Sequence, residues 1–403
     1  MDHNETDQFV RGKSFFRIPW VEAPSATTAR DGLGPLFSAN TCMHCHIKNG
    51  AGVAVDAQGK LERSVIFKLS SKTKLNNESL MTIGFTPDPV YGGQLSVNGN
   101  HSVLFEGRPK VHYVEQNGTY DDGTLYTLRV PHYQIEHLNY GPLDPAGNIA
   151  PHIALALIGL GHIEKIPQSV ILAAEDINDS DNDGISGKAN WVFNPETNTT
   201  QLGRFAWKAT AASIRHQSAD AAHNDMGLTS PLFTHENCTS VQKECLEAPK
   251  GVHEFDLPQS RLDAIAFYLS HLKVPRARPT SQEAKALFEQ LTCNRCHIPS
   301  YLTSEGVEIA PYSDFLLHDM GEALSDGHRA FLASESEWRT PPLWGVGLYK
   351  TVSGEANYLH DGRARSIEEA ILWHGGEARH AKEAFKALEK SKRDLLVAYV
   401  KAL

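Results

Sequence analysis

"LFSANTCMHCHI", residues 36–47, holds two cysteines and two histidines within five positions, and continues as "KNG" to complete the stretch "TCMHCHIKNG". A second stretch, "LFEQLTCNRCHI" at 287–298, repeats the Leu-Phe, Thr-Cys and Cys-His-Ile pairs at an offset of 251 residues. Each copy therefore carries the pattern Cys-x-x-Cys-His. Similarity that extends beyond the cysteines indicates a structural unit that occurs twice in the chain.

Three chemistries use paired cysteines, and the repeated histidine separates them. A zinc site needs four nearby ligands, and a redox dithiol needs a βαβ context that neither copy shows. Covalent haem attachment uses every repeated residue, because the cysteines form thioethers and the histidine binds the iron. We therefore predict two haem c groups, with zinc and a redox dithiol as the alternatives. The predicted tethers and iron ligands are Cys42, Cys45, His46, Cys293, Cys296 and His297.

The bulk composition is that of an ordinary globular chain of 403 residues, which is long enough for two domains. The net charge of -10 argues against a nucleic-acid partner, and no apolar run approaches the roughly 20 residues that span a bilayer. The polar N-terminus is not a secretion signal. Six cysteines nevertheless suit an oxidising compartment, so we expect an exported, periplasmic protein. We expect Cys238 and Cys245 to form a disulfide; the alternative is two free buried thiols.

The organisation follows from two similar apolar helices that we expect to close the two units, at 261–272 and 393–403. The proline-containing segment 273–281 is then a linker. We predict an N-terminal haem domain over 13–272 and a C-terminal haem domain over 282–403.

The first predicted domain is about twice the size of the second and therefore contains insertions. Strand-like runs within 85–141 are bounded by Asn-Gly and Asp-Gly turns, which predicts a β-hairpin or small sheet. Residues 151–166 look helical and buried. The predicted fold class is mainly α, with two cytochrome c-type domains, the first enlarged by β-hairpin and loop insertions.

Three long stretches carry a family resemblance: "APSATTARDGLGPLFSANTCMHCH", "DNDGISGKANWVF" and "RTPPLWGVGLYKTVSGEANYLHDGRARSIEEAILWHGGEA". Over nearly its whole length the chain resembles the di-haem oxidoreductases, also catalogued as thiol oxidoreductases. These proteins are related to the bacterial di-haem cytochrome c peroxidases.

The sixth iron ligand of the C-terminal haem is suggested by this resemblance. In the related peroxidases it lies 14 residues after the histidine of a His-Asp-Gly motif. That histidine is His360 here, which leads to His374. The "SIEE" sequence from Ser366 predicts a capped helix that ends at His374, before two glycines. Met320 is the alternative ligand.

The first domain offers no equivalent ligand. The position that corresponds to His374 is Lys243, and no second His-Asp-Gly motif is present. His216, His223 and Met226 are possible ligands, but nothing in the sequence fixes any of them. We therefore predict that the His46 haem is open or weakly capped and is the reactive one.

Five further residues are candidates for supporting roles. Tyr91 and Gln94 are weak candidates for a distal pocket, with an ordinary turn as the alternative. Trp207 could relay electrons between the haems, or be a core tryptophan. Arg339 and Arg363 are expected to pair with haem propionates, because arginine binds carboxylates bidentately; surface salt bridges are the alternative.

A possible calcium loop lies in "DSDNDGISGKAN", where Asp179, Asp181, Asp183 and Gly184 occupy positions 1, 3, 5 and 6 of an EF-like pattern. Position 12 is Asn190 instead of glutamate, so the bidentate ligand is missing. The alternative is a solvated turn.

The predicted function is that of an exported di-haem c-type oxidoreductase. A small redox donor protein, a cytochrome or cupredoxin, would reduce the C-terminal haem. The N-terminal haem would then reduce a small oxidant, with hydrogen peroxide as the leading candidate. The alternatives are an electron carrier without its own substrate, and a haem dehydrogenase that oxidises a small or protein substrate such as a thiol.

Overall fold

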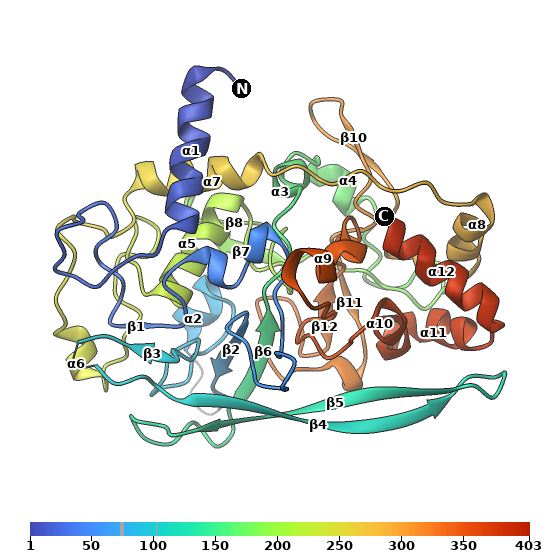
Figure 1. The fold of residues 1–403 in the computed structure, drawn as a ribbon, viewed down its shortest axis with the longest axis horizontal. Helices are drawn as coiled ribbons and strands as arrows, with labels where there is room; N and C mark the ends of the chain where they lie inside the picture. Colours follow the sequence, from blue (N-terminus) through green and yellow to red (C-terminus); the bar gives the residue numbers. More distant parts are fainter. Residues whose placement is uncertain (73–75, 102) are drawn as a thin grey trace.

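The computed structural model describes residues 1–72, 76–101 and 103–403. Helices account for 30% and strands for 18% of the chain, so the prediction of a mainly α fold is wrong. The described strands form six separate antiparallel sheets of two strands each. The helices gather around two apolar cores, each formed mainly by one half of the chain (Figure 1).

The first half is built on α1 (His3–Arg17) and α7 (Gln259–Ser270), which cross at close range (Figure 1). Asp2 and Glu5 form a capping box that starts α1. Gly12 permits the close crossing, because a Cβ atom there would lie 1.8 Å from the Ala264 carbonyl oxygen. The predicted closing helix at 261–272 is thereby confirmed as α7.

The second half repeats this arrangement with α8 (Gln282–Gln290) and α12 (Lys390–Ala402), the second predicted closing helix. Phe16 of α1 lies 5.4 Å from Tyr268 of α7 between ring centroids, and Phe288 of α8 lies 5.4 Å from Tyr399 of α12. The same aromatic pair therefore joins the opening and closing helices of both halves.

The sequence repeat differs from this structural repeat at one point. Leu36 and Phe37 align with Leu287 and Phe288 in sequence, but they form β1 (Leu36–Phe37), which pairs with β3 (Asn98–Gly99). The glycine and proline in "GLGP" just before them disfavour a helix. The opening helix of the first half is α1, much earlier in the chain.

The predicted strands within 85–141 form one long hairpin of β4 (Arg108–Thr119) and β5 (Leu125–Glu136). A second correction concerns residues 151–166, which are not one buried helix. β6 (Asn148–Ile153) pairs with β2 (Val65–Ser70), and only α3 (Leu160–Glu164) is helical. Pro151 and Gly159, the latter at φ +75°, interrupt a helix in this segment.

The disulfide between Cys238 and Cys245 is confirmed; Cys245 packs beside Leu36 and Val103 in a small core of its own.

No described helix has the length and apolar character needed to cross a bilayer. The remaining elements are η1 (Cys42–His44), η2 (Ile47–Asn49), α2 (Asn77–Thr82), α4 (Gln168–Leu172), β7 (Trp191–Asn194), β8 (Thr199–Leu202), α5 (Ile214–Met226), α6 (Lys243–Leu246), η3 (Cys293–Arg295), β9 (Tyr301–Leu302), β10 (Glu308–Ile309), β11 (Leu317–Asp319), η4 (Glu322–Leu324), β12 (Glu337–Arg339), η5 (Val346–Leu348), α9 (Tyr349–Ser353), α10 (Ile367–Trp373), η6 (Gly376–Ala378) and α11 (Arg379–Lys386).

The close α1–α7 crossing predicts the effect of Gly12→Ala. The added methyl group collides with backbone atoms, so we expect the free energy of unfolding to fall by about 1–3 kcal/mol. This is opposite in sign to the helix-propensity gain of about 1 kcal/mol. Thermal unfolding followed by circular dichroism measures the change, with exposed Lys13→Ala as the control. A more stable Gly12→Ala protein would contradict the crossing.

Candidate functional site

The two Cys-x-x-Cys-His motifs adopt the same local structure. Each forms one 3-10 turn, η1 or η3, closed by a hydrogen bond from the histidine N–H to the first cysteine's carbonyl at 3.0 Å or 2.9 Å. Burial raises the pKa of the Cys42 and Cys293 thiols to about 12. Reactive dithiols need a lowered thiol pKa, so the redox-dithiol alternative loses support.

A zinc site shared by the two motifs also finds no support in the described part of the chain. The clusters there that could hold a metal are Cys296 with Asp314 and His318, and Asp176 with Asp179 and Asp181. Neither cluster joins the two cysteine pairs.

Both motif histidines are oriented by a carbonyl from a distant segment. Nδ1 of His46 lies 2.8 Å from the Leu155 oxygen, and Nδ1 of His297 lies 2.9 Å from the Tyr312 oxygen. This bond fixes the proton on Nδ1 and leaves Nε2 as the metal-binding nitrogen, as in most protein metal sites. Burial lowers the pKa of both imidazoles to about 4, so both are neutral and able to bind iron.

Two cavities of very different size adjoin these histidines. The cavity at His46 has a volume of about 1110 Å³, and residues of η1 and α5 line it. The cavity at His297 has a volume of about 150 Å³.

The smaller cavity holds both predicted sixth ligands. His374 is the C-cap of α10, whose first turn is capped by Ser366, as the sequence predicts. Its Nδ1 lies 2.7 Å from the Ala370 oxygen, the same kind of bond that orients the motif histidines. His374 helps to lower the pKa of His297. Met320 also lines this cavity, so the structure brings His297 together with both candidates.

The larger cavity is lined by the three residues proposed as sixth ligands in the first half. His216, His223 and Met226 all lie on α5. Phe233 stacks on His223, with ring centroids 5.2 Å apart, and Met226 belongs to the apolar core. Burial lowers the pKa of His46. Among the described residues no other histidine adds to this lowering, whereas His374 does so for His297.

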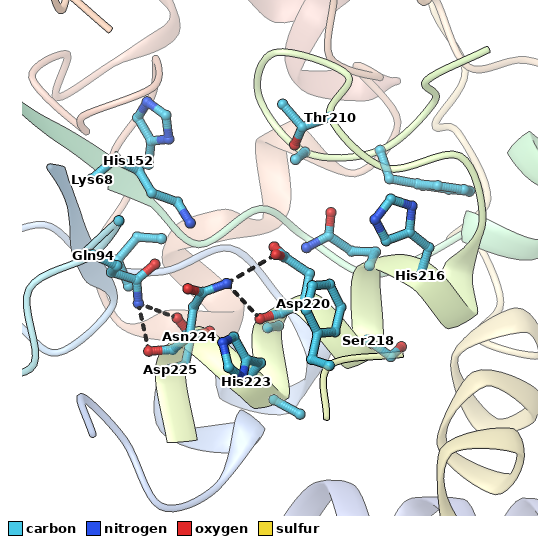
Figure 2. A pocket seen from close by; sticks show the side chains of 18 of the residues that line it. Lys68, Gln94, His152, Thr210, His216, Ser218, Asp220, His223, Asn224 and Asp225 are labelled. Carbon is cyan, nitrogen blue, oxygen red and sulfur yellow. Dashed lines mark hydrogen bonds between the residues drawn. The ribbon is translucent and has the colours of Figure 1, made fainter. Parts of the chain in front are cut away.

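A polar wall faces the larger cavity, as Figure 2 shows. The Gln94 amide donates to the Asp225 carboxylate at 2.7 Å and to the Asn224 carbonyl at 3.1 Å. Burial raises the pKa of Asp225 to about 6. Lys68 points toward the same space (Figure 2). Tyr91 lies elsewhere, because it is buried in a separate apolar core and its hydroxyl donates to the Gly141 carbonyl at 2.5 Å.

Trp207 lines both cavities and therefore lies in the wall between them, which we call the partition. Its indole N–H donates to the Ile153 carbonyl at 2.7 Å. Its ring centroid is 6.5 Å from that of Trp338, which stacks on His360 at 3.8 Å. Aromatic rings therefore lead from the large cavity to the small one.

The two predicted propionate partners have different surroundings. Arg339 lines both cavities, is 4% exposed, and its guanidinium donates to the Ala206 and Thr340 carbonyls. No carboxylate of the described residues lies within ion-pair distance, so it can take an anionic ligand. Arg363 is already paired with Asp361 at 3.0 Å and adjoins neither cavity.

The acidic loop gathers a slightly different set from the predicted one. Oxygens of Asp176, Asp179 and Asp181 lie within 4.8 Å of one another. The Asp183 carboxylate lies instead 3.5 Å from the guanidinium of Arg295, the residue that precedes the second cysteine of the second motif. Calcium binding stays a prediction.

A buried network of charged side chains in the partition was not predicted from the sequence. His152 bonds to Asp326 at 2.9 Å, and the Lys208 ammonium lies 3.5 Å from Asp326 and 3.9 Å from the Trp338 ring centroid. Asp225 was not predicted either. For Lys208 the useful signal was a charged residue inside the otherwise apolar stretch "FAWKA", whereas Asp225 lies in the polar stretch "HNDMG" and has no such signal.

Comparison with known proteins defines the class. A family model described as "Di-haem oxidoreductase, putative peroxidase" matches residues 1–403, the whole chain. The chain belongs to this di-haem oxidoreductase family. No curated protein gives a significant match.

One solved structure with some similarity is a xenon-pressurised hydrazine synthase from Kuenenia stuttgartiensis, at 16% identity. The match covers 63% of this chain and 73% of that chain, with a TM-score of 0.32. At this score the similarity carries no argument about fold or function.

The buried Asp225 predicts a pH-dependent stability. Its folded-state pKa is raised from 3.8 to about 6, so its protonated form favours the fold, and that contribution is lost as pH rises through 6. The free energy of unfolding of Asp225→Asn, relative to that of the wild type, should therefore increase by about 1.4 kcal/mol per pH unit between roughly pH 4 and 6. Denaturant unfolding of the haem-loaded proteins measures this, with exposed Asp7→Asn as the charge-matched control. A pH-independent difference would contradict the assignment.

Proposed function

We propose that the chain is a c-type di-haem peroxidase, in which the N-terminal haem reduces hydrogen peroxide and the C-terminal haem supplies electrons. The observation that carries the proposal is the asymmetry of the two sites. His297 shares a narrow cavity with His374 and Met320, whereas His46 adjoins a cavity of about 1110 Å³. A saturated iron suits electron transfer, and an open one can bind a small oxidant.

The residues present fit two covalently attached haems. In each half, a buried cysteine pair and a neutral imidazole with an anchored Nδ1 adjoin a cavity. Arg339 supplies an unpaired buried cation for a propionate. His374 would hold the second haem together with His297, because its Nδ1 is anchored like those of the motif histidines; Met320 is the second candidate.

The reaction needs two electrons and two protons for each peroxide that becomes two waters. A haem with an open coordination site supplies the binding and reduction of peroxide. The chain's own groups contribute to proton delivery: burial raises the pKa of Asp225 to about 6, so its carboxyl group can hold one proton in mildly acidic solution, and Gln94 fixes its position. Trp207 and Trp338 bridge the partition through which electrons from the second site travel.

Two alternatives remain from the sequence. The polar pair of Gln94 and Asp225 in the wall of the His46 cavity favours a catalytic site over a pure electron carrier. A haem dehydrogenase that oxidises a small or protein substrate such as a thiol would use the same cavity, with electrons flowing in the opposite direction. We propose a small cytochrome or cupredoxin as donor and the periplasm as location; the disulfide supports an oxidising compartment.

Covalent attachment is tested by mass. Intact wild-type protein should carry two haems, and the double variant Cys42→Ser/Cys45→Ser only one, because serine forms no thioether. Cys238→Ser/Cys245→Ser is the control and should keep both haems. Wild-type protein with four free motif thiols would contradict the assignment.

Peroxidase activity is tested by mixing peroxide with protein and a reduced cytochrome. We expect two donor molecules to be oxidised per peroxide, and Asp225→Asn to lower kcat/KM for peroxide by about 100-fold or more. If the donor reduces both haems but peroxide fails to reoxidise them, the electron-carrier alternative holds.

A further inference from the structure

The β4–β5 hairpin belongs to the first half by sequence, yet it extends across the second half. Figure 1 shows the two strands running beneath both halves of the molecule. At its base, Tyr133 and Ile135 pack on the core around Phe67 of β2. At its tip, Tyr120 and Leu128 are buried in the core of the second half.

The middle of the hairpin is hydrogen-bonded to the turn that contains His360. The Arg129 guanidinium donates from Nε to the Arg363 carbonyl at 2.7 Å and from Nη2 to the Gly362 carbonyl at 2.9 Å. Arg129 is 8% exposed and lies 4.3 Å from the Tyr113 ring centroid. Within the described residues it has no carboxylate partner, so these two carbonyls are the acceptors that hold this buried cation.

This turn leads directly into the helix that carries the proposed iron ligand. His360 lines the small cavity and stacks on Trp338. Three residues after Arg363, Ser366 caps α10, which ends at His374. A second contact fixes the helix itself, because the Tyr120 hydroxyl donates to Glu368 at 2.7 Å.

We propose that Arg129 is a positioning residue for the C-terminal haem site: it holds the His360 turn and, with Tyr120, sets the placement of α10 and of His374. An inserted element of the first half thus determines the ligand geometry of the second. The inference rests on the proposed role of His374 as iron ligand. Arginine suits this role because its rigid planar fork holds two carbonyls in a fixed geometry, whereas a lysine ammonium sits on a flexible stem.

The test records each haem separately in resting, fully loaded protein without peroxide or donor. Electron paramagnetic resonance resolves the two ferric signals, and spectroelectrochemical titration gives their midpoint potentials. Arg129→Met should shift the signal and potential of the C-terminal haem and leave those of the N-terminal haem unchanged. Arg129→Lys should shift them less, and Tyr120→Phe, which removes one hydroxyl, should shift the same signal.

Lys110→Met is the control, because Lys110 is a cation of the same hairpin whose ion-pair partner among the described residues is Glu136 of that hairpin. It should leave both haems unchanged. Wild-type C-terminal signals in Arg129→Met and Tyr120→Phe, or equal shifts at both haems, would overturn the proposal. If Arg129→Met does not fold, Arg129→Lys and Tyr120→Phe decide by the same readout. Failure of peroxide reduction in wild type would refute the peroxidase proposal alone, since these signals require no turnover.

Discussion

The structure depends on one repeated constraint: a backbone carbonyl from a distant segment fixes Nδ1 of the histidine in each motif. Leu155 does this for His46, and Tyr312 does it for His297. The bond selects the tautomer and the ring plane, so Nε2 has a defined direction before any metal binds. The Leu155 carbonyl follows β6, which pairs with β2, and the sheet in the first half therefore contributes to the geometry of the motif.

The asymmetry between the halves follows from what is added around this shared unit. In the second half, α10 brings a third anchored imidazole into the cavity of His297. In the first half, α5 places His216 and His223 on the wall of a much wider space, together with Asp225. Two sites built on the same Cys-x-x-Cys-His motif can therefore offer a haem iron different ligands and hence different reactivity.

The sequence was sufficient where local chemistry decides the structure. The two motifs, the closing helices, the Asp122-Gly123 turn of the hairpin and the Ser366 cap follow from short sequence patterns, and each has the expected form. The Asn117-Gly118 pair, predicted as a turn, lies inside β4 instead. It was insufficient where distant segments meet. The helical reading of 151–166 ignored Pro151 and the pairing with β2, and the alignment of Leu36 with Leu287 could not reveal that α1 replaces the expected opening helix. Asp225, Lys208 and Arg129 look like ordinary charged residues until the fold buries them.

The most direct test of the central claim is the cyanide stoichiometry of the ferric protein, followed by magnetic circular dichroism of both haems. The account predicts one cyanide per chain, bound at the His46 haem, while the His297 haem stays low-spin with two protein ligands. Two haems that are both low-spin and take up no cyanide would contradict it.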